Sequence, residues 1–249
     1  MAFSEITILL CVLAVVVCSV HLMHKYWPYT KRREHNDVAG FVFAGIGVMY
    51  GVLLAFVVIV ASDGLDSART ITYDEANQLA NVYWMSRGLP QPQGAAIEGL
   101  ALNYARTVVG TEWPLMEKGE SSGQAQLLLD RIREDVLGFT PRTDQQEFVY
   151  EQELTSVNAL SAARRNRLAA MNETIPEPMW VVLIVGGLIT VGFCLLFGLQ
   201  NKLVHAGMVA SLAVLITISL LLIKNMQYPF AGDPHIGPEA FQIFLSQVR

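Results

Sequence analysis

The sequence predicts an all-α protein with four transmembrane helices and a helical extramembrane bundle inserted between spans 2 and 3. Four long apolar runs, about residues 6–23, 38–62, 179–199 and 204–223, carry this prediction. Each is close to or above the roughly 20 residues that cross a bilayer as a helix. The composition agrees, because 53% of the residues are hydrophobic, only 16% are charged, and the mean hydropathy is +0.39. We therefore expect a membrane hairpin (1–62), an extramembrane helical domain (63–177), and a second hairpin with a C-terminal tail (178–249).

Charge and cysteine content exclude some classes of partner and fold. The net charge is -5, whereas a nucleic-acid-binding protein normally carries a basic surface. We expect no nucleic-acid partner. Cys11, Cys18 and Cys194 all lie in apolar runs, so no disulfide framework is predicted.

The first span starts close to Met1 and has neither a basic leader nor a small-residue cleavage site. It is interpreted as a retained helix, with a cleaved signal peptide as the alternative. The loop that follows contains Trp27 and Tyr29, which suit the membrane interface. Its basic residues are Lys25, Lys31, Arg32 and Arg33.

The second span is the element around which the chain is organised. Its 25 residues from Val38 to Ser62 carry no charge, and no proline separates them from the helical pattern that continues to about Trp84. Small side chains recur along one face at Gly40, Ala44, Gly47, Gly51 and Ala55. Such a face allows another helix to approach closely in lipid. Helix packing and the lining of a pore are both compatible with it.

The segment from residue 63 to 177 turns polar, with seventeen acidic and ten basic residues. Periodicity predicts three further helices there, at 95–109, 123–137 and 144–172. Gly110 and Gly138 are expected to end the first two. The third helix has an apolar repeat that Ser161 and Arg164 interrupt, and we expect it to pair with the continuation of the second span.

The second hairpin begins after Pro176 and Pro178, with Trp180 as an interfacial anchor. A short turn at 200–203 separates its two spans. The tail after residue 224 contains prolines and a few apolar residues, which suggests that it folds back on the inserted domain.

Basic residues give conflicting indications of which side of the membrane the inserted domain lies on. The short loops contain most of the basic residues near the spans, which favours cytoplasmic loops and an external inserted domain. Four arginines near the membrane ends of the insert favour the opposite orientation: Arg69, Arg164, Arg165 and Arg167. Long loops weigh little in this rule, so we expect an external domain in a bacterial inner membrane.

Few residues suggest chemistry. Four histidines lie near the basic loops (His21, His24, His35 and His205), but no pair has the i, i+4 spacing of a metallohydrolase helix, so they are interpreted as interfacial residues. Asn36 and Asp37 are expected to cap the second span. Two acidic clusters, Asp74/Glu75 and Glu147/Glu151/Glu153, are interpreted as solvated helix faces. No catalytic, phosphate-binding or metal-binding motif is present, so we expect no enzymatic activity, cofactor or metal.

The spans have no Asp, Glu, Lys or Arg in their central thirds, which argues against proton relays and coupled transport. An apolar pore remains possible, because a hydrophobic constriction gates by dewetting. We expect such a constriction to come from Val48, Leu54 or Phe56.

Four stretches resemble the bacterial bestrophin-like family of membrane proteins: HNDVAGFVFAGIGVMYGVLLAFVVIVA, YDEANQLANVYW, IPEPMWVVLIVGGLITVGFCLLFG and YPFAG. Residues 88–142 match no family pattern. The resemblance to bestrophins implies a homo-oligomeric anion channel, a pore lined by Gly40 to Phe56, and a cytosolic helical domain. The family's aromatic rings and acidic calcium clasp are missing, since Tyr228 to Asp233 offers a single acid.

The predicted function is therefore an oligomeric, bestrophin-like anion channel with lipid, further copies of itself and a small anion as partners. The alternative is a non-conducting membrane module whose inserted domain binds a partner or senses an envelope signal. The residues singled out as pore-lining or helix-packing are Gly40, Ala44, Gly47, Val48, Gly51, Leu54, Ala55 and Phe56.

Overall fold

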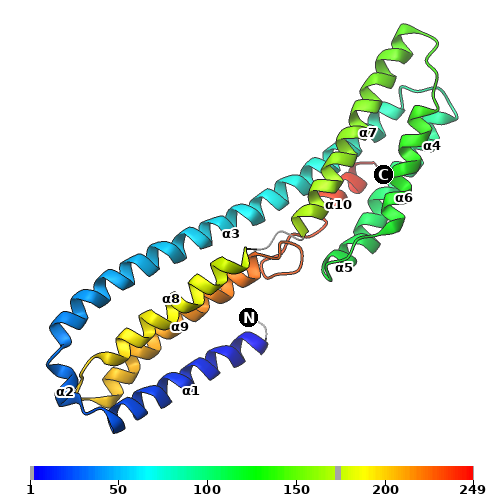
Figure 1. Ribbon diagram of the computed structural model, residues 1–249. Coiled ribbons are helices and arrows are strands. Elements are labelled where there is room, and N and C mark those ends of the chain that lie inside the picture. The colour runs from blue at the N-terminus through cyan, green and yellow to red at the C-terminus, as the bar shows by residue number, and fades with distance from the viewer. Residues whose placement is uncertain (1–2, 172–174, 249) are drawn as a thin grey trace. The chain divides into compact units, whose positions relative to one another are not determined.

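The computed structural model describes residues 3–171 and 175–248, which are helical apart from short connections and contain no strand (Figure 1). The predicted all-α fold is confirmed. The chain forms two compact units. One, the membrane unit, comprises Met1–Ser62 and Thr174–Gln227; the other, the bundle unit, comprises Asp63–Glu173 and Tyr228–Arg249.

Four helices are long and apolar enough to cross a membrane, as predicted. They are α1 (Phe3–Tyr26), α3 (Asn36–Ser86), α8 (Glu177–Leu196) and α9 (Lys202–Met226), and the short α2 (Tyr29–Arg33) lies between the first two. Helix α3 contains 51 residues and supplies its apolar part to the membrane unit and its polar part, from Asp63, to the bundle unit.

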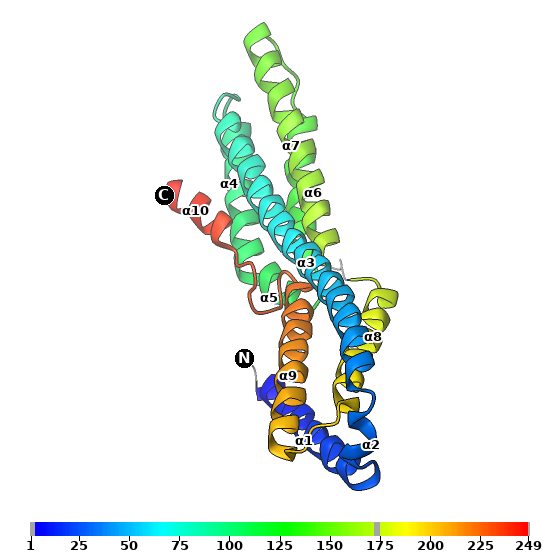
Figure 2. The same cartoon turned by 90° about the vertical axis from the view of Figure 1, so that its left-hand side faces the viewer.

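Within the membrane unit, α9 packs against both α1 and α8 (Figure 2). Small and β-branched side chains make this contact close. One buried cluster joins Val16 and Val20 of α1 to Val209 and Ala213 of α9, with Cys194 of α8 beside them. In lipid, packing apolar helices together gains no hydrophobic free energy. The contact between these helices therefore depends on close van der Waals packing.

The bundle unit contains the polar end of α3 and a set of shorter helices. These are α4 (Gln93–Thr107), η1 (Val108–Glu112), α5 (Trp113–Met116), α6 (Gly123–Leu137), α7 (Asp144–Met171) and α10 (Glu239–Gln247). Helix α4 packs against α6, and α6 against α7. The predicted bounds of α6 are confirmed. The predicted start of α7 at Asp144 is confirmed, and its predicted end at residue 172 lies outside the described residues.

The prediction that Gly110 ends a helix is wrong. Gly110 lies inside η1, a π-helical turn that links α4 directly to α5. Gly119, with a φ of 78°, follows α5 and adopts the left-handed backbone that glycine tolerates best. Helix α6 then begins at a Ser122 cap, whose hydroxyl accepts from the Ala125 N–H at 3.3 Å.

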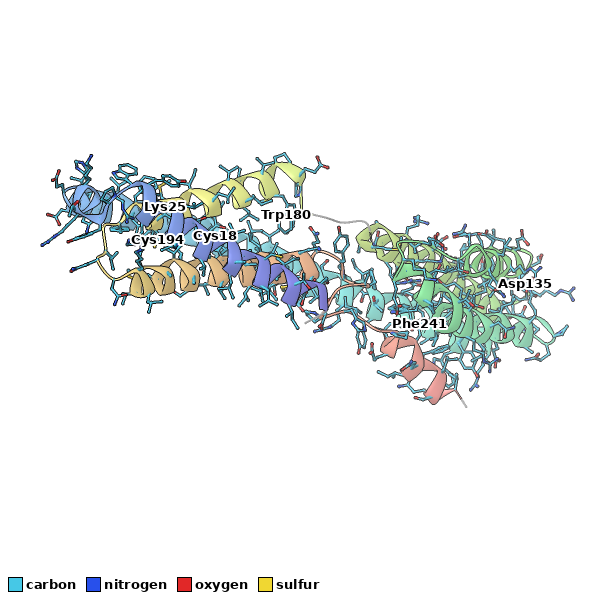
Figure 3. The ribbon with its side chains drawn as sticks, turned by 90° about the horizontal axis from the view of Figure 1, so that it is seen from below. Cys18, Lys25, Asp135, Trp180, Cys194 and Phe241 are labelled. Carbon is cyan, nitrogen blue, oxygen red and sulfur yellow. The ribbon has the colours of Figure 1, made fainter. Side chains whose placement is uncertain are left out.

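The C-terminal tail packs into the bundle unit, as its apolar residues suggest. The indole N–H of Trp113 donates to the Ile236 carbonyl at 3.1 Å. Phe230 and Phe241 make edge contacts with the Trp113 ring, with centroids 5.7 and 6.0 Å away. Phe241, labelled in Figure 3, is fully buried, so α10 contributes to the core of the bundle unit.

Candidate functional site

The membrane part of α3 contacts its own chain along one narrow stripe. Tyr50 lies at the centre of that stripe, and its hydroxyl donates to the Leu183 carbonyl of α8 at 3.0 Å. Gly186 and Gly187 provide the space for the ring, because a Cβ on them would lie 2.7 and 3.0 Å from Tyr50 atoms. Val57 and other apolar residues continue the contact toward Ile223 of α9.

The small-residue face of α3 is open within the chain. A Cβ added to Gly47 or Gly51 would meet no atom within 4 Å. Ala44 and Ala55 are exposed, and so are the flanking Val48 and Phe56, at 68% and 64%. At about 100° per residue, Gly51 lies roughly a quarter turn around the helix from Tyr50. The small-residue face therefore lies to one side of Tyr50, next to Leu54 and Val58, which pack with the buried cluster of Val57.

Two of the predicted residues lie apart from that open face. A Cβ on Gly40 would contact the Phe197 ring at 3.8 Å, and Leu54 packs with the buried cluster of Val57 and Leu183. Leu54, one of the three residues expected to form a constriction, thus packs within the chain. The six open residues are Ala44, Gly47, Val48, Gly51, Ala55 and Phe56.

Arg32 holds one end of the membrane unit together. It is only 3% exposed, and its Nη1 donates to the carbonyls of Leu195 and Phe197 at 3.0 Å each. Its Nε donates to the Trp27 carbonyl at 3.1 Å. These carbonyls belong to the ends of α8 and α1, where backbone acceptors lack helical partners, and a guanidinium satisfies them well.

The neighbouring contact between Asn36 and Gly198 fixes the start of α3. The Asn36 side-chain Oδ1 accepts from the Gly198 N–H at 2.8 Å, and the Asn36 Nδ2 donates to the Gly198 carbonyl at 3.3 Å. The predicted capping role does not describe this residue, because its amide is occupied by the chain after α8. Gly198 itself has no room for a Cβ, which would overlap the Arg33 backbone nitrogen.

Two histidines that are far apart in sequence meet near this end. His24 Nε2 and His205 Nδ1 are 3.0 Å apart, and His205 Nε2 lies 3.2 Å from the Cys194 carbonyl oxygen. A carbonyl only accepts, so His205 carries its proton on Nε2 and accepts from His24 through Nδ1. Among residues 3–171 and 175–248, no three His, Cys, Asp or Glu side chains gather in a way that would hold a metal ion.

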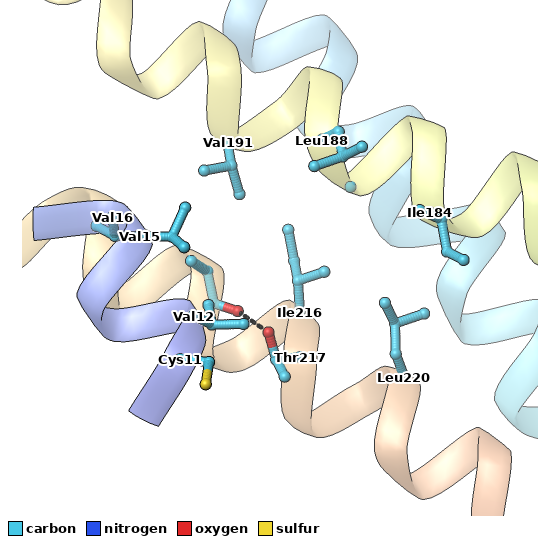
Figure 4. A pocket seen from close by; sticks show the side chains of 12 residues that line it. Cys11, Val12, Val15, Val16, Ile184, Leu188, Val191, Ile216, Thr217 and Leu220 are labelled. Carbon is cyan, nitrogen blue, oxygen red and sulfur yellow. Dashed lines mark hydrogen bonds between the residues drawn. The ribbon is translucent and has the colours of Figure 1, made fainter. Parts of the chain in front are cut away.

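The membrane unit also contains an apolar cavity of about 310 Å³ between α1, α8 and α9 (Figure 4). Cys11, Val15, Leu188 and Ile216 are among the side chains that line it. The Thr217 hydroxyl is turned to its own helix, donating to the Ala213 carbonyl at 2.7 Å. The lining therefore offers no group that selects a polar ligand.

The bundle unit is built around a buried ion-pair network. Arg167 of α7 binds Glu75 of α3 with two hydrogen bonds, Nε to Oε2 at 2.6 Å and Nη2 to Oε1 at 3.0 Å. It also reaches Glu112 Oε2 at 2.7 Å, and Tyr104 donates its hydroxyl to Glu75 at 2.6 Å. The side chains of Arg167, Glu75 and Glu112 are 0% exposed.

A second arginine completes the network. Arg164 Nη2 lies 2.5 Å from Glu112 Oε1, which also accepts from the Ser122 N–H at 3.1 Å. Arg164 Nη1 donates to Gln126 at 2.6 Å. With Arg167 and Glu75, the four charges sum to zero, and every carboxylate oxygen has a partner. Arg164 Nε is the one buried donor of these two arginines without a hydrogen-bond partner. The network leaves neither carboxylate free for catalysis.

The surroundings shift the protonation of this network in predictable directions. Burial raises the pKa of Tyr104, and the Glu75 carboxylate raises it further, so the phenol stays protonated as the donor. Burial by itself lowers the pKa of Arg167. Glu75, and then Tyr104 and Glu112, outweigh that effect and raise it overall. The guanidinium also lies over the Trp113 ring, 5.2 Å from its centroid.

Glu153 is the exception among the buried acids. It is 0% exposed and neither carboxylate oxygen has a hydrogen-bond partner. Burial raises its pKa to about 8, so the carboxyl is mostly protonated at neutral pH. The interpretation of the acidic clusters as solvated faces is therefore wrong for Glu75 and Glu153, whereas Asp74, Glu147 and Glu151 are exposed.

Sequence reasoning overlooked the polar residues of α7 for an identifiable reason. Ser161 and Arg164 look like breaks in an apolar repeat, yet with Val157, Leu160 and Arg167 they form one buried stripe at helical spacing. The signal was that the three-four repeat resumes in phase after them. Polar residues at positions that continue a core repeat indicate a buried network.

Comparison with known proteins identifies the family. The sequence matches the family described as "Bestrophin-like domain" over residues 10–241. No curated protein matches it significantly. A crystal structure of a membrane protein has the same fold, with a TM-score of 0.67 and 11% identity, covering 99% of this chain and 97% of that one. With four apolar helices and a family match over most of its length, the chain is a membrane protein that belongs to the bestrophin-like family.

Proposed function

We propose that the protein is a homo-oligomeric, anion-conducting membrane protein of a bacterial inner membrane, without enzymatic activity, and that the open face of α3 is where its copies meet. The observation that supports this most is the empty space beside Gly47 and Gly51. Small residues gain stability in lipid only when another helix backbone approaches them. No helix of the same chain does so among the described residues, which leaves a second copy as the partner.

The contrast with two glycines of α8 strengthens this proposal. Gly186 and Gly187 are covered by Tyr50 of the same chain, so their small size is explained by the fold of one copy. Gly47 and Gly51 have no such explanation. Their pattern is that of a surface for contact between helices, and a ring of copies joined there would bring several α3 helices around one axis.

Conduction through such a ring would depend on Val48 and Phe56. Both flank the open face and are more than 60% exposed in one copy. Rings of such side chains form an apolar constriction, which bars ions by dewetting. No acidic residue lies in the central third of α3's apolar part, so the lining lacks the carboxylate ring typical of cation channels. It lacks a ring of Lys or Arg as well, so the proposed preference for anions rests on the bestrophin resemblance.

The test is conductance of the purified protein in planar bilayers under a chloride gradient. Val48→Ser and Phe56→Ser should increase the conductance, because a polar ring hydrates more easily, and the reversal potential should follow chloride. Val181→Ser is the matched control, since Val181 is 61% exposed but lies on α8. It should behave as the wild type does. A reversal potential that follows the cation gradient would contradict the anion assignment.

A second candidate function is a non-conducting module whose bundle unit binds a partner. Exposed apolar residues on that unit favour it, notably Leu127 and Phe148, each 63% exposed. The same experiment separates the two functions. Silence of the wild type and both serine variants, with intact oligomers in the same membranes, would support the module and refute the channel.

A further inference from the structure

A second cavity lies at the end of the membrane unit that contains Arg32. It has a volume of about 410 Å³ and is lined by Ser19, Leu22, Met23, Tyr26, Trp27 and Leu195. The lining is mostly apolar, and two aromatic residues stand at the end nearest the loop. From Ser19 to Trp27 it follows α1 for about 12 Å at 1.5 Å per residue. It therefore has the form of a groove that runs along a span toward the interface.

Arg32 forms hydrogen bonds to two of the residues that line this groove. Its Nε binds the Trp27 carbonyl at 3.1 Å and its Nη1 binds the Leu195 carbonyl at 3.0 Å. Both of these residues line the groove, one from each side. The groove is therefore a built feature of the unit, held by a buried side chain, rather than a chance gap between helices.

The loop that follows the groove along the chain is positively charged. Four basic residues and two acids, Glu34 and Asp37, lie between residues 25 and 37. Lys25, Lys31 and Arg33 are exposed, and no ion pair found among the described residues includes them. The Lys25 Nζ lies 5.5 Å from the centroid of the Tyr26 ring, which lines the groove. Figure 3 shows Lys25 toward one end of the membrane unit and Trp180 toward the other.

We propose that this groove binds an anionic phospholipid, with an acyl chain against Leu22, Met23 and Leu195 and the phosphate beside Lys25, Lys31 and Arg33. The two halves of the site match the two halves of that ligand. An apolar groove alone would accept any lipid, and a basic loop alone would accept any anion. Their continuity selects a molecule that joins an apolar chain to a negative headgroup. Nη2 of Arg32, which has no hydrogen-bond partner, adds buried positive charge to this corner.

This site is independent of the proposed channel. It lies on α1, α2 and α8, whereas the open face belongs to α3. It would act as an anchor for annular lipid whether or not the protein conducts, so failure of one proposal leaves the other in place.

Native mass spectrometry of the full-length protein tests the site, using phosphatidylglycerol and phosphatidylcholine with identical acyl chains. Basic residues attract an anionic headgroup, so phosphatidylglycerol should bind at least about tenfold more tightly. Changing Lys25, Lys31 and Arg33 to Gln together should abolish that preference without touching Arg32. Equal binding of the two lipids by the wild type would overturn the proposal.

Two variants separate the halves of the site. Lys25→Gln should lower phosphatidylglycerol binding, while Lys224→Gln, an exposed lysine at the far end of α9, should not. Leu22→Trp fills the groove from a half-exposed position and should weaken the binding of the intact lipid. If glycerol phosphate competes as well as the whole lipid, the loop is a simple anion site. If lipid binds only to monomers, the groove is a contact between copies. Either result contradicts the proposal.

Discussion

Arg167 and Glu75, which are 92 residues apart in the chain, form an ion pair closed to solvent inside the bundle unit. Two hydrogen bonds of 2.6 and 3.0 Å hold it, and both side chains are 0% exposed. This pair joins α7 to the polar part of α3. Apolar residues of both helices, such as Leu79 and Leu160, belong to the same buried cluster, so the ion pair adds to the apolar contact that the sequence predicts.

Removing one partner of this pair should destabilise the bundle unit strongly. Arg167→Gln keeps most of the side-chain volume but leaves the Glu75 charge buried without a cation, which typically costs about 3–5 kcal/mol. Arg165→Gln is the control, because Arg165 is the exposed neighbour on the same helix. Chemical unfolding should show the loss in the first variant alone. A cost below about 1 kcal/mol for Arg167→Gln would refute a structural role for the network.

Glu153 should make the bundle unit less stable as the pH rises. Its pKa is about 8 in the folded protein and near 4.5 when unfolded, so the folded state binds more protons between these values. Stability from this group is full below about pH 4.5 and is lost as the pH rises to 8, by a few kcal/mol. Glu153→Gln should remove most of that slope between pH 5 and 8, whereas the exposed Glu151→Gln should not. An unchanged slope in Glu153→Gln would show that the carboxyl is paired or hydrated in solution.

Orientation can be decided by labelling. With Cys11, Cys18 and Cys194 replaced, single cysteines at Thr30 and Ser121 should react oppositely with an impermeant thiol reagent in intact cells. Both positions are exposed, so access depends on the side of the membrane. The charge rule predicts label at Ser121. Label at Thr30 alone would contradict it and support the cytosolic domain implied by the bestrophin resemblance.

The fold was largely accessible from the sequence, because local patterns specify it. The apolar runs locate four spans, and the segment from Gly123 to Leu137, ended by Gly138, is recognised to the residue. The contacts that close each unit were not accessible. Whether Glu75 is solvated or buried depends on Arg167, and whether Arg32 is a surface charge depends on the end of α8. No local pattern contains such partners.

The candidate site on α3 was likewise predictable only in part. Periodicity places Gly47 and Gly51 on one face of a helix, which the structure bears out in its geometry. It does not tell which flank of α3 its own chain covers. Tyr50 decides that, by docking on Gly186 and Gly187, and so leaves the small-residue face uncovered while Leu54 packs inside.

The central claim is that copies of the chain meet at the open face of α3, and the subunit number of Gly47→Leu tests it most directly. The added side chain meets no atom of its own chain within 4 Å of the Cβ position, so each copy should still fold. Gly192→Leu is the matched control, because that glycine of α8 is equally free of neighbours. Gly187→Leu, which would meet Tyr50 and Ile216, should instead impair the fold of a single copy.

Native mass spectrometry from lipid nanodiscs, with helix content and melting measured on the same samples, gives the answer. We predict an oligomer for the wild type and for Gly192→Leu, and a folded monomer for Gly47→Leu. A Gly47→Leu protein with the wild-type subunit number and unchanged melting would contradict the account, and so would a wild type that is monomeric in lipid.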